Sequence, residues 1–229
     1  VVCEKPLSMT IEEAEELVAV AKETGLINAV HFNLRYYPMV RQMRVMRQKG
    51  ELGDVYSVMG SYLQDWLIHK TDYSWRLDYE EYEVTSEDYA TIMLRFDNGR
   101  TGSIVVSQVN AGRKNRLNIE ISGSKANFEF NAEKPNELWI GKRDTANSIL
   151  MKDPALVDEG ARSLVSFPGG HQEGFPDTSK QLFKEVYAAI RDGKQPEAPT
   201  FPTFADGLRE LIIGEAIVES NANEAWVKI

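Results

Sequence analysis

The first 32 residues constrain the fold most, because they contain a strand, a helix and a second strand in immediate succession. The small apolar residues Val1–Cys3 predict a fully buried strand. Thr10 and Glu13 form a capping box at the start of the helix. Ile27–Phe32 predicts the second buried strand. This order implies parallel strands joined by a right-handed crossover, and we expect residues 1–32 to be the last such unit of a doubly wound domain.

Charged residues follow the first strand at the point where it should end. Glu4 and Lys5 stand there, and Pro6 stops the hydrogen-bond ladder. The carboxyl ends of strands in an open α/β sheet face the ligand crevice. Lys5 could therefore act as a proton donor, a hydrogen-bond donor or an electrostatic clamp on a substrate oxygen. The alternative interpretation is a Glu4–Lys5 pair in a surface turn, which would contribute little.

The rest of the chain predicts a largely antiparallel open sheet with helices on one face, so the fold class is α/β followed by α+β. Hairpin-length gaps and turn residues separate most of the expected strands. Little regular structure is expected between Arg143 and Gly170. The expected helices are Pro38–Lys49, one capped by Asp177 and ending at Gly193, and one capped by Thr203 with Asp206. The expected strands are Val55–Gln64, Tyr89–Phe96, Gly102–Val109, Leu117–Ser122, Ala126–Asn131, Glu137–Ile140 and a short final strand at Ala225–Lys228.

Composition excludes several classes of protein. A net charge of −9 over 229 residues argues against nucleic acid or an anionic membrane as partner. The single cysteine, Cys3, excludes an intrachain disulfide framework and is expected to be a buried thiol. No apolar run of transmembrane length and no signal-peptide pattern occur, so we expect a cytoplasmic protein. The three histidines lack metal-ligand spacing, so no metal site is predicted.

Two further stretches could line a binding pocket. Trp66, Trp75 and Arg76 combine aromatic faces with polar groups, as carbohydrate pockets do, although an amphipathic loop covering the sheet edge explains them as well. His171 follows two glycines that would let the backbone approach a ligand, and its ring could hydrogen-bond a hydroxyl. A purely structural histidine is the alternative there. His31, inside a predicted strand, is interpreted as a satisfied core histidine.

Together these stretches resemble the Gfo/Idh/MocA family of NAD(P)-dependent oxidoreductases. The matching residues are Glu4-Lys5-Pro6, Asn33-Leu34-Arg35-Tyr36-Tyr37-Pro38, Trp75-Arg76, Gly170-His171-Gln172-Glu173-Gly174-Phe175 and Phe204-Ala205-Asp206-Gly207. The resemblance implies a Rossmann domain ending near residue 32 and a C-terminal α/β domain over 33–229. It also implies hydride transfer between NAD or NADP and a sugar, inositol or related polyol.

The resemblance assigns roles to individual residues. Lys5 matches the catalytic lysine of the family's Glu-Lys-Pro motif, and Glu4, Lys5 and Pro6 would border the nicotinamide and its ribose. Substrate binding is expected at the matching residues Arg35, Tyr36, Trp75, Arg76 and His171. We expect Lys5, Arg76 and His171 to converge on one cleft, because groups that share a substrate must all reach it.

The sequence departs from the family pattern in two places. The Gly-rich dinucleotide fingerprint belongs before Val1 and is absent, and the chain has no initiator Met. The Asp-x-x-x-His helix should follow Trp75-Arg76, yet residues of a later strand come almost at once. We therefore expect that a segment is missing near residues 81–85, that the chain is part of a longer protein, and that this part alone is inactive.

A non-catalytic sugar-binding or oligomerisation module remains the alternative to an enzyme. Alternation along Gly102–Val109 and Leu117–Ser122 leaves one sheet face semi-polar, with Asn118 and Glu120 on it. Such a mixed face suits a subunit contact, and family members commonly pair through this sheet. We expect a homodimer or homotetramer formed through it.

Overall fold

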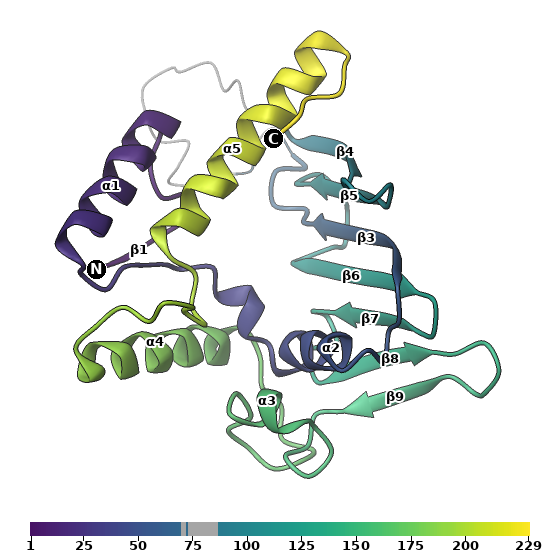
Figure 1. The fold of residues 1–229 in the computed structure, drawn as a ribbon. Helices are drawn as coiled ribbons and strands as arrows, with labels where there is room; N and C mark the ends of the chain where they lie inside the picture. Colours follow the sequence, from purple (N-terminus) through teal and green to yellow (C-terminus); the bar gives the residue numbers. More distant parts are fainter. Residues whose placement is uncertain (70–71, 73–86) are drawn as a thin grey trace. The chain divides into compact units, whose positions relative to one another are not determined.

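The computed structural model describes residues 1–69, 72 and 87–229 (Figure 1). The chain forms two compact units, which are described separately. Unit 1 contains Val1–Tyr37 and Gly174–Ile229, and unit 2 contains Pro38–Glu173. The helices near the end of the chain thus group with the N-terminal residues. The predicted boundary after residue 32 separates a Rossmann domain from a C-terminal domain, whereas these units are defined by compactness. The predicted boundary therefore stays a prediction.

Unit 1 is built on the predicted strand–helix–strand arrangement. Strands β1 (Val2–Cys3) and β2 (Ala29–Val30) pair in parallel, and α1 (Ile11–Thr24) connects them. The capping box forms as predicted, since the Thr10 hydroxyl accepts from the Glu13 backbone and the Glu13 carboxylate accepts from the Thr10 backbone. The remaining elements are η1 (Asn33–Tyr36), α4 (Phe175–Asp192) and α5 (Phe204–Asn223).

The core of unit 1 lies where α1 and α5 meet β2. Leu7, Ala14, Val30 and Phe204 are buried there together. The expectation that Val1–Cys3 are fully buried is wrong for the described structure, because Val1 is 73% and Val2 37% exposed. Among the residues described, β1 has only β2 as a sheet neighbour, which leaves its other edge open. Cys3 is partly buried, and its thiol lies 3.7 Å from the Leu7 carbonyl oxygen.

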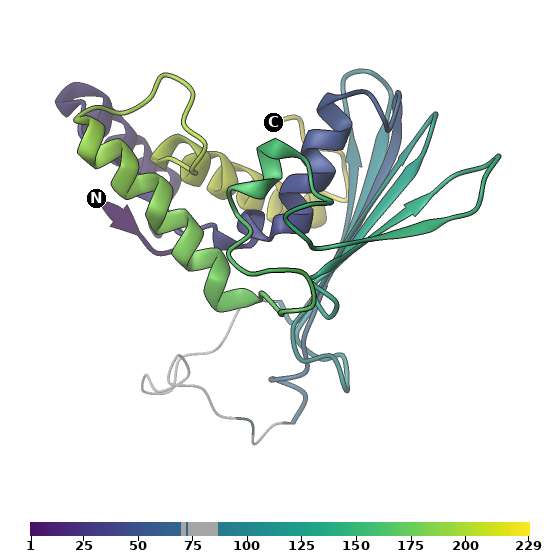
Figure 2. The same cartoon turned by 90° about the horizontal axis from the view of Figure 1, so that it is seen from below.

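Unit 2 is a twisted open sheet (Figure 2), for which the described residues supply seven strands in the order β4-β5-β3-β6-β7-β8-β9. The strands are β3 (Val55–Leu63), β4 (Tyr89–Arg95), β5 (Thr101–Ser107), β6 (Arg116–Gly123), β7 (Asn127–Asn131), β8 (Glu137–Gly141) and β9 (Ser148–Met151). All neighbours are antiparallel except β3 and β5. Helix α2 (Pro38–Gln48) packs on β7 and β8, and α3 (Glu159–Arg162) packs on α2.

The strand register divides the sheet into an apolar face and a mixed face. The apolar face carries residues such as Ile119, Phe128 and Leu138. The mixed face carries Met59, Met93, Asn118, Glu120 and Glu129, among others. The predicted alternation of Asn118 and Glu120 with an apolar set is therefore confirmed by the register.

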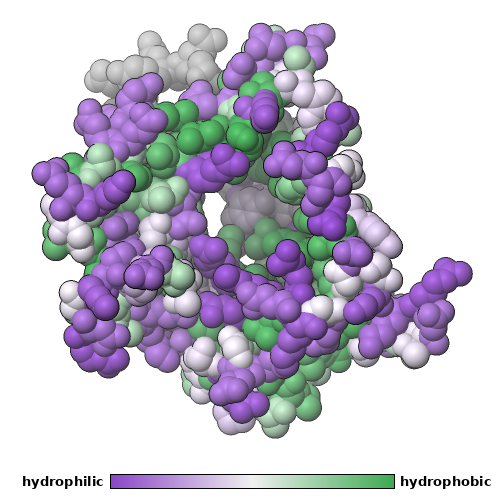
Figure 3. All heavy atoms as spheres, viewed as in Figure 1, coloured by the Kyte–Doolittle hydropathy of each residue, from purple (hydrophilic) through white to green (hydrophobic). Residues whose placement is uncertain are grey.

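The expectation of little regular structure between Arg143 and Gly170 holds for most of that stretch, but it missed two short elements, β9 and α3. The polar tip between β8 and β9 protrudes as a hydrophilic loop (Figure 3). Two other local expectations are wrong. Ala225–Lys228 forms no strand, since no sheet edge pairs with it. Asp177 lies three residues inside α4, where its carboxylate accepts from the backbone N–H of Gly174, the residue before the helix.

Candidate active site

The carboxyl edge of the β1–β2 pair carries the predicted catalytic residue Lys5 and its predicted cofactor-binding neighbours Glu4 and Pro6. Cys3 and Val30 are register partners, so Glu4 and His31 follow them side by side. Glu4, Lys5 and Pro6 are all exposed, and the Lys5–Pro6 peptide bond is cis. This edge of a parallel pair is where the sequence predicted chemistry, and the structure leaves the three side chains accessible to a ligand.

His31 links this edge to helix α4. Its Nδ1 lies 2.8 Å from Glu4 Oε1, and its Nε2 lies 3.1 Å from Ser179 Oγ. The ring also stacks on Phe183, with centroids 5.6 Å apart. The prediction of a satisfied histidine is correct, because both ring nitrogens have partners and the side chain is only 17% exposed. Its partnership with Glu4 was not predicted.

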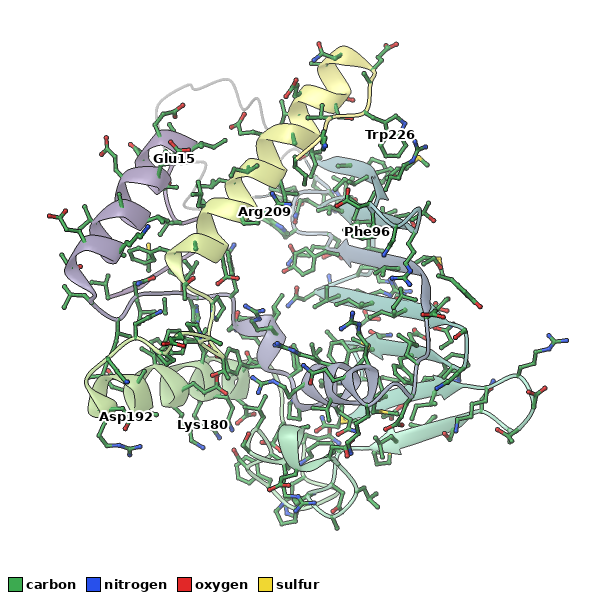
Figure 4. All side chains as sticks on the ribbon, in the orientation of Figure 1. Glu15, Phe96, Lys180, Asp192, Arg209 and Trp226 are labelled. Carbon is green, nitrogen blue, oxygen red and sulfur yellow. The ribbon has the colours of Figure 1, made fainter. Side chains whose placement is uncertain are left out.

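The charge of Lys5 acts on a carboxyl group of α5, that of Glu210. The Lys5 charge lowers the pKa of Glu210, while burial, the larger effect, raises the pKa of that carboxyl above its ordinary value. Glu210 follows Arg209, which is labelled in Figure 4. Among the described residues, none makes a hydrogen bond or ion pair with Lys5 Nζ. The ammonium is thus available to a substrate oxygen. The Glu210 carboxyl, whose pKa is raised, interacts electrostatically with it.

The predicted substrate residues Arg35 and Tyr36 differ in their surroundings. Arg35 is exposed in η1. Tyr36 is completely buried, and its hydroxyl donates a 2.8 Å hydrogen bond to Glu185 of α4. Tyr36 thus anchors η1 to α4, and the substrate contacts predicted for both residues stay predictions.

His171 belongs to unit 2, where a buried lysine holds its backbone. Lys152 Nζ donates to the carbonyl oxygens of Phe167, Pro168 and His171, at 3.1, 3.3 and 2.8 Å, and to Glu173 Oε2 at 2.9 Å. The Lys152 and Glu173 side chains are 1% and 0% exposed. The imidazole of His171 itself is exposed. Lys152 therefore fixes the loop while leaving the ring free to meet a ligand.

The predicted convergence of Lys5, Arg76 and His171 stays a prediction. Trp75, Arg76 and the suspected gap near 81–85 lie outside the described residues, and Lys5 and His171 belong to different units. Trp66 is described, and its indole N–H donates to Gln108.

In the described part of the chain, no group of three or more His, Cys, Asp or Glu side chains could hold a metal ion. No helix of the described residues is long and apolar enough to cross a membrane.

Sequence reasoning missed His31, Ser179 and Glu210 as members of this site. The parallel pairing of β1 and β2 could have revealed His31, because it fixes which residue follows β2 beside Glu4. Nothing in the local sequence marks Glu210 or Ser179, since helices α5 and α4 bring them in from far along the chain. The resulting arrangement can donate a proton at Lys5 and accept hydrogen bonds at Glu4.

Comparison with known proteins identifies the family. A family model described as the oxidoreductase family, C-terminal alpha/beta domain (GFO_IDH_MocA_C), matches residues 50–229. Levoglucosan dehydrogenase of Pseudarthrobacter phenanthrenivorans is 25% identical, over 100% of this chain and 73% of that protein. The 1,5-anhydro-D-fructose reductase of Ensifer adhaerens is 32% identical, over 97% of this chain and 70% of that protein.

A solved structure shows the same likeness. Levoglucosan dehydrogenase in complex with NADH and levoglucosan matches with a TM-score of 0.87 and 26% identity, over 100% of this chain and 73% of that one. The family match covers most of the chain, and Glu4-Lys5-Pro6 lies before the matched residues. The chain belongs to the Gfo/Idh/MocA family of oxidoreductases.

Proposed function

We propose that the full-length parent of this chain is an NAD(P)-dependent dehydrogenase that transfers hydride between nicotinamide and a sugar, inositol or related polyol. The observation that carries the proposal is the exposed Lys5 in a Glu-Lys-Pro sequence at the carboxyl edge of parallel strands. The relatives support it, because their names describe a dehydrogenase of levoglucosan and a reductase of anhydrofructose.

The residues at this edge fit a nicotinamide nucleotide. Dinucleotides bind at the carboxyl ends of parallel strands, and Glu4, Lys5 and Pro6 are exposed there. When bound, the nicotinamide supplies or accepts the hydride. Lys5 donates a proton to the substrate oxygen during reduction and accepts it during oxidation, which is the role of a positioned general acid or base. Glu4 and Pro6 would border the nicotinamide and its ribose.

The substrate side of the proposal keeps the residues that the sequence predicted. Arg35, Trp75, Arg76 and His171 would supply the aromatic face and hydrogen-bonding groups that a polyol needs, with Tyr36 anchoring η1. The exposed imidazole of His171 supports this role, since it can hydrogen-bond a hydroxyl. The choice between NAD and NADP depends on residues upstream of β1.

Replacing Lys5 with Met tests the catalytic assignment in the full-length protein. The variant keeps the aliphatic stem but loses the proton donor, so we expect kcat to fall by about 100-fold or more. The dissociation constant for the nicotinamide nucleotide should change far less. Turnover is measured with a panel of sugars and polyols by the absorbance of the reduced nicotinamide.

Lys22→Met is the matched control, because it makes the same chemical change at an exposed position of α1. Its turnover should equal that of the wild type. If Lys5→Met also turned over normally, Lys5 would have no part in the reaction. If no sugar or polyol were oxidised or reduced by the full-length wild type, the proposed function would be wrong.

The proposal also states that an internal segment is missing from this chain and that the chain alone is inactive. The alignment with levoglucosan dehydrogenase spans 294 positions although this chain has 229 residues, so that relative carries aligned residues with no counterpart here. This supports a missing segment, for which we propose the region near 81–85. This chain alone should therefore show no turnover and no measurable binding of NADH by fluorescence titration, whereas the full-length parent should show both. A cytoplasmic location is part of the same proposal.

A further inference from the structure

The end of β2 and the start of α4 form a hydrogen-bonded chain that leads to Glu4. Ser179 Oγ and Asn33 Nδ2 lie 3.3 Å apart, and Asn33 Nδ2 also donates to Thr178 Oγ1 at 2.8 Å. Asn33 and Thr178 are buried. Ser179 then meets His31 Nε2, and His31 Nδ1 meets Glu4 Oε1. One polar path therefore runs from the first turn of α4 to the Glu-Lys-Pro sequence.

The chemistry of the partners fixes where the His31 proton lies. An ionised carboxylate only accepts hydrogen bonds, so Nδ1 must carry a proton to donate to Glu4. In the neutral ring Nε2 is then an acceptor, and the Ser179 hydroxyl can donate to it while its oxygen accepts from Asn33. Stacking on Phe183 restricts the ring plane. His31 is thereby held in one orientation with one nitrogen aimed at Glu4.

The two oxygens of Glu4 then have separate tasks. Oε1 accepts from His31 and Oε2 accepts from the Lys5 backbone N–H at 3.3 Å. The Glu4 side chain is 73% exposed, so without His31 it would be free to change rotamer and to pair with the neighbouring ammonium. With His31 in place, the carboxylate accepts the hydrogen bond of the Lys5 backbone N–H. Lys5 Nζ then has no partner among the described residues.

We propose that His31 is a positioning residue that holds the Glu4 carboxylate against the Lys5 backbone, so that the Lys5 ammonium stays aimed at substrate. This inference rests on the proposed function, because it assigns Lys5 the catalytic role. It places His31, Ser179 and Asn33 in the reaction without any contact to substrate. Small misplacements of a catalytic group lower turnover strongly, so the effect should appear in kcat.

Two substitutions of His31 separate positioning from packing. In His31→Asn, the side-chain amide lies near the place of Nδ1 and can still donate to Glu4. In His31→Gln, the amide lies near the place of Nε2 and reaches toward Ser179 instead. In the full-length protein we expect His31→Gln to lower kcat on the order of 10-fold with little change in the substrate KM, and His31→Asn to recover most of the loss. Equal kcat in both variants, or a loss confined to KM, would overturn the proposal.

A spectroscopic measurement tests the hydrogen-bonded chain without relying on turnover. Nitrogen-15 NMR of histidine side chains distinguishes a proton on Nδ1 from one on Nε2. The sequence of this chain has three histidines, His31, His69 and His171. The signal that disappears in His31→Asn is therefore that of His31. At mildly alkaline pH we expect His31 to be protonated on Nδ1 and Glu4→Gln to shift the population toward Nε2.

The NMR and turnover measurements distinguish a failure of the positioning role from a failure of the catalytic assignment of Lys5. A wild-type His31 protonated mainly on Nε2 would contradict the positioning role whatever the activity. If Lys5→Met kept full turnover while His31 was protonated on Nδ1, the catalytic assignment of Lys5 would be wrong. In that case the positioning role would be wrong as well, although the Glu4–His31 contact would stand.

Discussion

Two glycines of α5 have opposite surroundings at the scale of single residues. A Cβ added at Gly207 would lie 2.8 Å from Leu7 Cβ and 3.0 Å from Val30 Cγ2. A Cβ added at Gly214 would meet nothing within 4 Å. Both positions are helical, so the same substitution has a packing cost at one position and a conformational benefit at the other.

Gly207→Ala should therefore destabilise the protein and Gly214→Ala should stabilise it. Overpacking against Leu7 and Val30 is expected to lower the free energy of unfolding by about 1–3 kcal/mol. The alanine at 214 should raise it by up to about 1 kcal/mol, because alanine favours the helix over glycine. Urea unfolding of both variants measures the difference. A Gly207→Ala variant as stable as the wild type would show that α5 does not pack closely on Leu7 and β2.

His31 illustrates which parts of a site the sequence can predict. Its place inside a predicted buried strand correctly indicated a mostly buried, hydrogen-bonded ring. The Glu-Lys-Pro sequence indicated the edge at which β1 ends. The partners Ser179 and Glu210 could not be predicted, because helices about 150 or more residues away supply them and no local periodicity reports on such contacts.

At the scale of elements, the buried Lys152–Glu173 pair connects β9 to the loop that carries His171. Glu173 Oε1 also accepts from the Ser166 backbone, and Asn136 bonds the Glu173 backbone at both its N–H and its carbonyl. Both charges are almost completely buried. The attraction between them therefore offsets the cost of removing each charge from water. The pair thus fixes a loop that has little regular structure of its own.

Removing either charge should destabilise unit 2 strongly. Lys152→Met leaves a buried carboxylate and Glu173→Gln leaves a buried ammonium, so each single variant should lose about 3 kcal/mol of stability. The double variant should lose less than the sum, because no charge remains uncompensated. Thermal and urea unfolding of the four proteins completes the cycle. Strict additivity would mean that the two charges do not depend on each other.

Asp158 ties α3 to α2 and gives unit 2 a dependence on pH. Its carboxylate accepts from Lys49 and from Gln42 at 2.8 Å. The Lys49 hydrogen bond, followed by that of Gln42, lowers the pKa of Asp158 below its ordinary value of 3.8, although burial opposes this. A carboxyl whose pKa is lower in the folded state stabilises the fold above its ordinary pKa and loses that contribution as the pH falls through the folded value.

The melting temperature of Asp158→Asn should accordingly lie below that of the wild type at neutral pH. The difference should shrink as the pH falls below 3.8, because the wild-type carboxylate becomes protonated. Calorimetry at a series of pH values measures this. The exposed Asp192→Asn, at the end of α4 (Figure 4), is the control and should show no such trend. A constant difference at all pH values would contradict the role of the Asp158 charge.

Element prediction succeeded where the signal was local and failed where it depended on a partner. The α1 capping box and the turns between β4, β5 and β6 are encoded by neighbouring residues, and these elements formed close to their expected ends. Strand β9 was missed because Ser148–Met151 is short and lies in a polar stretch, and it forms by pairing with β8. Ala225–Lys228 has strand-like residues but pairs with no strand in the described structure.

At the scale of the whole molecule, we propose that the mixed face of the sheet is a subunit interface. Met59, Tyr89 and Met93 lie on this face and are 44%, 56% and 68% exposed. Asn118, Glu120 and Glu129 make the same face polar elsewhere. Apolar groups within a polar surround are typical of protein–protein contacts. Ser107 also belongs to this face but is fully buried, so it is a poor position for a test charge.

Met93→Glu should therefore dissociate the full-length oligomer. The new charge would be desolvated in an interface, whereas Val20→Glu, a control at an exposed apolar position of α1, should leave the mass unchanged. Light scattering at micromolar concentration measures both. A monomeric wild type, or a Met93→Glu variant that keeps the wild-type mass, would show that this face is not the interface.

The position of β3 in the sheet has a consequence for synthesis on the ribosome. This strand is flanked by β5 and β6, and both of them follow it in the chain. While residues up to Ser107 are still being made, neither backbone edge of β3 has its final partner. Unpaired edges invite pairing with other chains, and partners distant in sequence are found slowly. We therefore expect that slowing translation between β3 and β5 increases aggregation of the nascent protein.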